Sequence, residues 1–156
     1  DIPTIAFVEG DCVGGGCGIA MACDIRVATP AARFAITPAK LGLVYPLHDV
    51  KLLVDLVGPG QAKRILYTGR LLDAGEALRI GLVEQVAESP QGLIDDILAA
   101  SPHSLRQTKR FIRRVLDGQT GDDAETLAIF AAAFEGPDFL EGTRAFVAKR
   151  KPEFGR

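Results

Sequence analysis

The sequence predicts an α/β fold over residues 1–100, followed by a helical extension over residues 101–156. Two observations predict this division. The apolar, β-rich run from Thr4 to Val8 leads into three consecutive glycines and then an apolar, helix-compatible segment, which is typical of a strand, a tight loop and a buried helix. After Ser89-Pro90 the composition favours helices to the end of the chain. We therefore expect one α/β core and a separate helical part.

Strands and helices are predicted to alternate through the α/β part. Short apolar runs predict further strands at residues 26–29, 33–36 and 82–86. Three helices are expected between them: residues 47 to a stop at 58–60, residues 61–67 and residues 74–80. Asp73 is a suitable N-cap for the third helix, and Gly81 a suitable residue to end it.

The extension contains three strong helix predictions. Ser101 and Pro102 are typical of an N-cap and a first helical position, and this helix is expected to end at Leu116. Residues 117–121 form a glycine-containing linker. Two more helices are predicted over residues 122–135 and 137–150.

Composition excludes several functional classes. A chain of 156 residues with 47% hydrophobic residues can bury one core. Its net charge of −2, with no basic run longer than Lys149-Arg150-Lys151, argues against nucleic acid as a partner. No apolar stretch is long enough for a membrane span, so we expect a cytoplasmic protein with no membrane partner. The three cysteines (Cys12, Cys17 and Cys23) are then reduced thiols, and the distant His48 and His103 predict no metal site.

The glycine run has a chemical use. A helix that starts after glycines presents unpaired backbone N–H groups with no Cβ in front of them, backed by the positive end of the helix dipole. Such a site stabilises an oxyanion. A packing turn or a phosphate loop would also explain three glycines, but the lysine of a G-x-x-x-x-G-K-[ST] loop is missing.

Several separated motifs decide between these readings. They are Ile2-Pro3-Thr4-Ile5-Ala6-Phe7-Val8-Glu9-Gly10, Gly14-Gly15-Gly16-Cys17, Ala22-Cys23-Asp24-Ile25-Arg26-Val27-Ala28, Phe34 to Gly42, Thr68-Gly69, Ala74-Gly75-Glu76-Ala77, Gly81-Leu82-Val83 and Glu141 to Pro152. In this order, over nearly the whole chain, they resemble the crotonase (enoyl-CoA hydratase/isomerase) superfamily. The resemblance implies the C-terminal portion of a ββα spiral. It also implies an acyl-CoA thioester as substrate, a place in fatty acid metabolism and no cofactor beyond the CoA of the substrate itself.

The resemblance also implies roles for single residues. The N–H of Gly15 would bind the thioester oxygen, with Gly14 and Gly16 beside the substrate. The first residues, Asp1-Ile2-Pro3, match a point where relatives have already completed an N-terminal half, so we expect the C-terminal part of a subunit. By the same resemblance, the absent half would supply the second oxyanion N–H and most of the adenine pocket.

Two acids of the superfamily's hydratases are missing. Their positions hold Gly18 and Pro38 in this sequence. Water addition needs a base for the water and an acid for the carbon, and neither Gly nor Pro can serve. Plain hydration is therefore not expected.

The segment Thr37-Pro38 followed by Tyr45 is similar to the methylmalonyl-CoA decarboxylase branch of the superfamily. Loss of CO₂ forms the enolate without a base, and Tyr45 would position the carboxylate or relay a proton; a half-buried phenol of structural role is the alternative. His48 and Asp49 would reach the acyl pocket, or else be a surface residue and a helix-start charge. The resemblance thus implies a lyase or isomerase with Tyr45, His48 and Asp49 as catalytic candidates and Pro38 near the substrate.

The C-terminal motif implies contact with a neighbouring subunit. Phe146 and Lys149 match positions that cover a neighbour's CoA site, and a homotrimer or hexamer follows from the resemblance. Three functions stay open beside decarboxylation: a hydratase or isomerase with other acid–base residues, a catalytically silent CoA-thioester-binding protein, and an assembly role.

Overall fold

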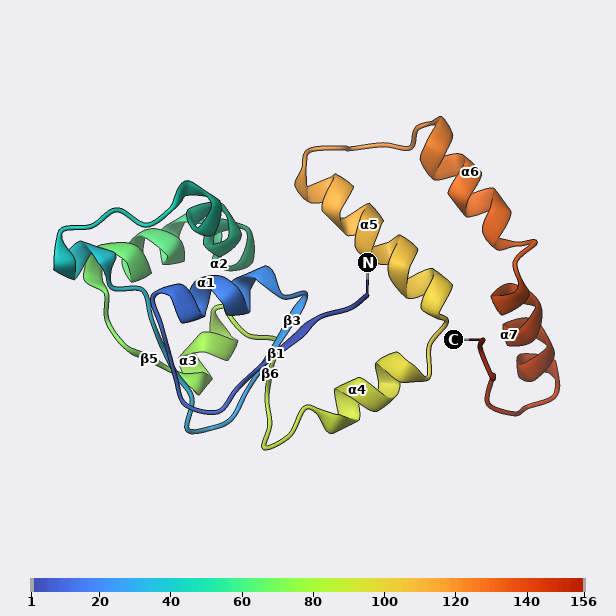
Figure 1. Ribbon diagram of the computed structural model, residues 1–156, viewed down its shortest axis with the longest axis horizontal. Helices are drawn as coiled ribbons and strands as arrows, with labels where there is room; N and C mark the ends of the chain where they lie inside the picture. The colour runs from blue at the N-terminus through green and yellow to red at the C-terminus, as the bar shows by residue number, and fades with distance from the viewer. Residues whose placement is uncertain (1, 156) are drawn as a thin grey trace. The chain divides into compact units, whose positions relative to one another are not determined.

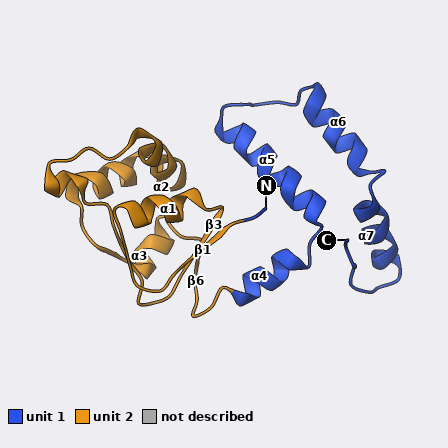
Figure 2. Ribbon diagram, in the orientation of Figure 1, with its two compact units in different colours: residues 1–3, 91–156 blue, residues 4–90 orange. Residues whose placement is uncertain are grey.

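The computed structural model describes residues 2–155, and these form two compact units. Residues 4–90 make the α/β unit, and residues 2–3 with 91–155 make the helical unit (Figure 2). The division falls after Pro90, whereas we had expected it after residue 100. The ten residues between the two points belong to the helical unit because they form its first helix.

Two three-stranded sheets organise the α/β unit (Figure 1). In the first, β1 (Ile5–Val8), β3 (Ile25–Ala28) and β6 (Gln85–Val86) are parallel in the order β1-β3-β6. The second sheet has the order β2-β4-β5. In it β2 (Asp11–Val13) pairs with β4 (Arg33–Ala35) in parallel, and β5 (Leu72–Asp73) pairs with β4 antiparallel. Strands β1 to β4 therefore alternate between the two sheets, whereas β5 pairs with β4 in the same sheet.

A helix follows each strand pair and completes the repeat. The helical elements are α1 (Gly15–Ala22), the 3₁₀ helix η1 (Pro38–Leu41), α2 (Leu47–Thr68) and α3 (Ala74–Arg79). The series β1-β2-α1 and β3-β4-α2 gives two ββα turns, so the predicted ββα fold class is confirmed. Inside α2, Gly58 has a φ of 74°, so the predicted stop at residues 58–60 is present as a kink between two helical segments.

A buried arginine holds the first sheet together. The side chain of Arg26 is 4% exposed and forms an ion pair with Glu84. Its Nε donates to the carbonyl of Leu82 at 3.0 Å, and its Nη1 donates to the carbonyl of Cys23 at 2.8 Å. Because burying an arginine is costly unless every donor is satisfied, these partners explain how a charge can sit between β3 and the segment before β6.

The strand predictions were incomplete. The sequence pattern contained no signal for β2 and β5, and it placed a strand over residues 82–86 where only 85–86 pair. Strands of two or three residues carry no measurable alternation, and they exist because a neighbouring strand accepts their hydrogen bonds. Leu82 and Val83 are buried instead as the turn that follows α3.

The helical unit holds α4 (Gln91–Leu98), α5 (Pro102–Leu116), α6 (Ala124–Ala133) and α7 (Pro137–Val147). The limits predicted for α5 are confirmed, with the Ser101 hydroxyl accepting from the N–H of Ser104 at 3.0 Å. Helix α6 begins later than predicted because Asp123 is its N-cap, and α7 ends at Val147 rather than at Arg150. Among residues 2–155, no helix has the length and apolar character needed to cross a bilayer.

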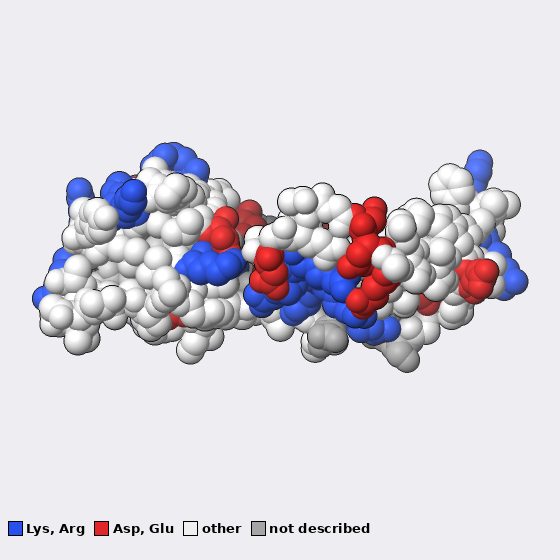
Figure 3. All heavy atoms as spheres, turned by 90° about the horizontal axis from the view of Figure 1, so that it is seen from above, with Lys and Arg blue, Asp and Glu red and all other residues white. Residues whose placement is uncertain are grey.

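Ion pairs join α5 to the start of α6. Arg114 pairs with both Asp123 and Glu125, and Arg110 pairs with Glu125 at 3.2 Å. On the face drawn in Figure 3, basic and acidic atoms of this kind lie beside one another. Each pair is exposed and contributes little alone, but as a network they set the register of the two helices.

Candidate functional site

The glycine loop turns the chain from β2 into α1. Gly14 is the N-cap of α1 and has a φ of 57°, a conformation that favours glycine. Its N–H donates to the carbonyl of Ala35 on β4 at 2.8 Å, and its carbonyl accepts from the N–H of Gly18 at 3.3 Å. The neighbouring strand and the first helical turn thus hold the loop from both sides.

The first two N–H groups of α1 are not used by the protein. Within residues 2–155, neither the backbone N–H of Gly15 nor that of Gly16 forms a hydrogen bond. Both residues are exposed, and a Cβ built on Gly15 would meet no atom within 4 Å. This end of α1 therefore offers unpaired donors and open space, the two properties that an oxyanion needs.

Two side chains converge on α1 one turn further on, at Gly18. A Cβ built on Gly18 would lie 3.1 Å from Oδ2 of Asp49 and 3.3 Å from the hydroxyl of Tyr45. Tyr45 comes from the loop before α2 and Asp49 from the first turn of α2. The space that any side chain at position 18 would take is thus already occupied by a carboxylate and a phenol.

Tyr45 is held in place and stays protonated. Its side chain is buried, and its hydroxyl donates to the carbonyl of Gly14 at 3.0 Å. Burial, followed by the charge of Asp49, raises the pKa of Tyr45 to about 12. Tyr45 therefore acts as a neutral donor to the glycine loop at physiological pH.

Asp49 has no comparable partner. The residue is half-buried, and among residues 2–155 no donor or cation forms a hydrogen bond or ion pair with its carboxylate. Helix α2 has Pro46 as its N-cap and no side-chain cap, so Asp49 does not serve that purpose either. Within the described residues, no hydrogen bond or ion pair therefore assigns this carboxylate a structural role.

The other predicted residues of the α/β unit are not brought to this point. His48 is exposed at the second position of α2. Pro38 begins η1, where its carbonyl accepts from the N–H of Leu43 at 2.9 Å. Neither side chain is among the atoms nearest to Gly18.

The thiols beside the loop are structural. Cys17 Sγ donates to the carbonyl of Cys12 at 2.7 Å, and both residues are buried. The hydrogen bond with Cys12 and then burial raise the pKa of Cys17, so this thiol is unreactive. Within residues 2–155, no three His, Cys, Asp or Glu side chains are grouped so that they could hold a metal ion.

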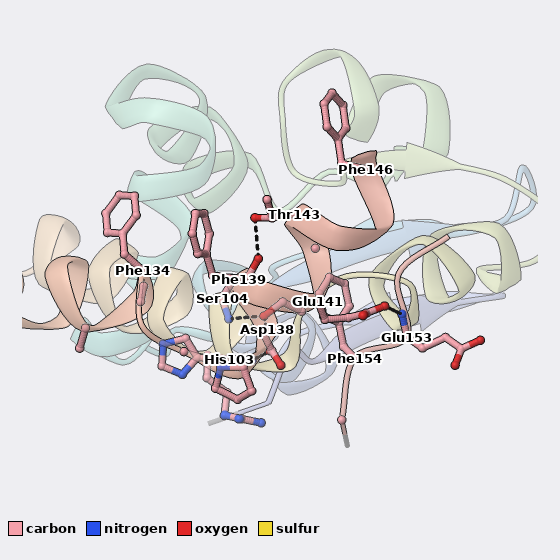
Figure 4. Close-up of a pocket in the computed structure, with 18 of the residues that line it drawn as sticks. His103, Ser104, Phe134, Asp138, Phe139, Glu141, Thr143, Phe146, Glu153 and Phe154 are labelled. Carbon is pink, nitrogen blue, oxygen red and sulfur yellow. Dashed lines mark hydrogen bonds between the residues drawn. The ribbon is translucent and has the colours of Figure 1, made fainter. Parts of the chain in front are cut away.

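A separate cavity lies within the helical unit. It measures about 1040 Å³, and its lining comes from α5, α6, α7 and the residues that follow them (Figure 4). Phe134 and Phe139 meet edge to face there, with ring centroids 5.3 Å apart. All its lining residues lie between Ser101 and Gly155, so the glycine loop is not part of it.

Phe146 and Lys149 both belong to this helical unit. Phe146 lines the cavity, yet its side chain is 85% exposed. Lys149 follows α7 with a φ of 53° and is exposed. Whether they meet a CoA molecule stays a prediction.

Sequence reasoning identified the glycine loop, Tyr45 and Asp49 separately, but missed that they meet. Gly18 had been noted only for the acid that it lacks. No spacing along the chain links residue 18 to residue 49, so the contact required the packing of α1 on α2. The glycine at position 18 was the one signal in the sequence, because a residue without a side chain leaves room for a group from elsewhere in the chain.

Comparison with known proteins identifies the family of this chain. The family described as enoyl-CoA hydratase/isomerase matches residues 1–156. A candidate enoyl-CoA hydratase of Thermus thermophilus is 41% identical over 160 residues, which cover 97% of this chain and 62% of the relative. A crotonyl-CoA hydratase of Syntrophomonas wolfei is 36% identical, with 97% and 61% covered.

Among solved structures, a candidate enoyl-CoA hydratase/isomerase family protein from Hyphomonas neptunium superimposes with a TM-score of 0.93 at 45% identity. That match covers 98% of this chain and 61% of the other. The chain thus spans less than two thirds of the length of these relatives.

Proposed function

The chain belongs to the enoyl-CoA hydratase/isomerase family, and from this premise we propose that it serves an acyl-CoA enzyme that stabilises a thioester enolate. The observation that carries the proposal is the unpaired N–H of Gly15 at the start of α1. An enolate oxygen placed there accepts a hydrogen bond that no protein group competes for. One such donor typically supplies about 3 kcal/mol of transition-state stabilisation.

Among the reactions of the family, hydration is disfavoured for this chain. Gly18 and Pro38 stand where hydratases carry their two acids, and general acid–base groups are worth about 10²–10⁴ each in rate. The relatives named as hydratases support an enoyl-CoA substrate. They do not supply this chain with the missing side chains.

The Thr37-Pro38 and Tyr45 pattern favoured decarboxylation, but the surroundings of Asp49 and Tyr45 argue against this reaction. A malonyl-type substrate would bring a second carboxylate next to the unpaired charge of Asp49, and like charges at close range repel. The proton of Tyr45 is already committed to the carbonyl of Gly14. The residue is therefore poorly placed to bind a substrate carboxylate.

The function we propose is a proton shift at the carbon beside the thioester, as in moving a double bond between the β,γ and α,β positions of an enoyl-CoA. This reaction passes through the enolate and needs no activated water. CoA enters as part of the substrate, with no separate cofactor.

The test is a substrate panel with purified full-length protein. Double-bond shift of a β,γ-enoyl-CoA should exceed both hydration of crotonyl-CoA and decarboxylation of a malonyl-type CoA ester. Fastest turnover of either of the other two would refute the assignment. Tight binding of all three esters with no turnover would instead show a silent CoA-thioester-binding protein.

The role of Gly15 is tested by two substitutions. Gly15→Pro removes the N–H, and Gly15→Ala keeps it while adding a methyl group to open space. Proline is tolerated at a first helical position, so both variants should fold. We expect about a 10²-fold or larger loss of kcat for Gly15→Pro relative to Gly15→Ala. Equal activity of the two would contradict the oxyanion role.

We also propose that the helical unit covers a neighbouring subunit in a homotrimer or hexamer. The support is the exposed apolar surface of α6 and α7, including Phe130, Phe134 and Phe146, which a chain in isolation leaves in water. Lys149 would then reach a phosphate of the neighbour's CoA.

A further inference from the structure

We propose that Asp49 is the catalytic acid–base group of this site, and that it acts through the space left by the missing side chain of Gly18. The proposal rests on the proposed function and names the group that moves the proton. The resemblance implies that hydratases carry an acid at position 18 on α1, and here the carboxylate nearest to that position comes from Asp49 on α2.

The first support is position. Oδ2 of Asp49 lies 3.1 Å from the point where a Cβ of residue 18 would stand. Gly18 follows Gly14 by one helical turn, so the two lie on the same face of α1. The Asp49 carboxylate therefore lies on the face of α1 that begins at the glycine loop.

The second support is that the Asp49 carboxylate has no structural role within the described residues. Asp49 is half-buried, and within residues 2–155 its carboxylate forms no hydrogen bond or ion pair. A charge in the first turn of α2 complements the helix dipole, but the dipole would be served equally by a carboxylate pointing into water. It does not account for a carboxylate packed against Gly18.

Tyr45 is a positioning residue in this arrangement. Its hydroxyl would lie 3.3 Å from a Cβ on Gly18 and donates to the carbonyl of Gly14 at 3.0 Å. Because Tyr45 is buried and its hydroxyl is hydrogen-bonded to Gly14, the phenol has little freedom to move beside Asp49. It thus limits the directions in which the carboxylate can move.

The step is a simple proton transfer. The ionised carboxylate takes a proton from the α-carbon of the β,γ-enoyl thioester, and the electrons of the broken C–H bond form a C=C bond. The thioester π electrons move onto the oxygen at the N–H of Gly15. The enolate then collapses, and the protonated Asp49 returns the proton to the γ-carbon, so one carboxylate completes the cycle.

The first experiment measures exchange of the α-proton of a saturated acyl-CoA in D₂O with full-length protein. Asp49→Asn keeps the size of the side chain but not its basicity, and should lower the exchange rate about 10²–10⁴-fold with unchanged affinity for the thioester. Asp55→Asn is the matched control, since Asp55 lies on the same helix and pairs with Lys51 at 2.7 Å. Wild-type exchange by Asp49→Asn would overturn the proposal.

The second experiment relocates the acid. Gly18→Glu alone should be poorly active, because its Cβ would stand within 3.1 Å of Asp49 and bring two carboxylates together. Gly18→Glu combined with Asp49→Gly returns the acid to α1 and removes the closer of the two groups that occupy this space. Exchange by the double variant should exceed that of either single variant by about tenfold or more. A double variant no better than Gly18→Glu, while both fold by circular dichroism, would contradict the replacement.

Failure of this inference and failure of the proposed function give different results. If Asp49→Asn retains exchange while Gly15→Pro loses it, the enolate site stands and another group carries the proton. If Gly15→Pro retains exchange, the oxyanion site itself is wrong. A Tyr45→Phe variant that raises KM or weakens the effect of Asp49→Asn would support positioning, and one identical to wild type in kcat, KM and exchange would remove Tyr45 from the site.

Discussion

Lys149 is the residue whose backbone is most out of keeping with its side chain. Its φ of 53° lies in the region that favours glycine. The N–H of Lys149 donates to the carbonyl of Phe146 and that of Arg150 to the carbonyl of Ala145, which together make a Schellman ending for α7. Glycine usually occupies this position, so a lysine here suggests that the side chain has a use beyond ending the helix.

Lys149→Gly should therefore raise the free energy of unfolding by about 0.5–1 kcal/mol, because it relieves the left-handed backbone. If Lys149 meets a phosphate, affinity for CoA should fall at the same time. Chemical denaturation and CoA titration measure the two effects. Lys151→Gly is the control, and since its φ is ordinary, no gain in stability is expected; a gain of the same size there would refute the explanation.

Among the contacts between secondary-structure elements, Asp138 links two helices of the helical unit, α5 and α7. It lies in the first turn of α7, and its Oδ2 accepts from the hydroxyl of Ser101 at 2.5 Å and from the N–H of His103 at 3.4 Å. Ser101 in turn caps α5. One carboxylate thus stabilises the N-terminal ends of both α5 and α7.

Asp138→Ala should lower the free energy of unfolding by about 1–2 kcal/mol, the usual cost of losing a cap and a hydrogen bond to a charged group. Urea denaturation measures it. Asp117→Ala, at the opposite end of α5, should change stability far less. Similar losses in the two variants would show that Asp138 contributes no more than a surface charge.

A second element-scale contact folds the chain back after α7. Glu141 accepts from both Nη atoms of Arg150, at 2.6 and 2.9 Å. It also accepts from the N–H of Glu153 at 2.8 Å (Figure 4). The hydrogen bonds from Arg150, followed by that from Glu153, lower the pKa of Glu141 to about 2. Arg144 adds a smaller effect in the same direction.

Because the pKa of Glu141 is lowered from 4.5, the unfolded chain binds the proton more readily than the folded chain. The stabilisation is complete above pH 4.5 and is lost as the pH falls towards 2. Wild type should therefore be more stable than Glu141→Gln at neutral pH, and the difference should shrink across this window. Thermal unfolding of both proteins from pH 2 to 6 tests this, and a difference that does not vary with pH would contradict it.

At the scale of the whole molecule, the two units differ in how much they bury. The α/β unit has a continuous core that includes Leu53, Ile65 and Phe34. The long helices of the other unit, α5 and α6, leave Ile112, Val115 and Phe130 exposed, and α7 buries Ala145 while exposing Phe146. Apolar surface of this kind is stabilised by a partner, which a homo-oligomer would provide.

If the helical unit covers a neighbouring subunit as proposed, removing residues 142–156 should both dissociate the oligomer and weaken CoA binding. Size-exclusion chromatography with light scattering measures assembly, and titration with CoA measures affinity. The Lys149→Gly variant serves as the comparison, since it should lose CoA affinity without dissociating. A truncated protein that stays assembled and binds CoA normally would remove the argument for Phe146 and Lys149.

The sequence by itself determined the elements with strong local signals. Ser101 and Pro102 predicted the start of α5, Asp73 predicted the cap of α3, and the glycine run predicted the loop before α1; each is present. Caps and glycine turns are local because the side chain or backbone bonds within three or four residues. The separated family motifs likewise predicted the family.

Only the tertiary structure decided what the site contains. The strands β2 and β5 exist through pairing with β4, which no local pattern reveals. Likewise, residue 18 is separated from Tyr45 and Asp49 by about thirty residues of chain, and they meet because α2 packs against α1. Sequence patterns report periodicity and local bonding. The position of the Asp49 carboxylate beside Gly18 instead depends on how α1 and α2 pack, which no local pattern records.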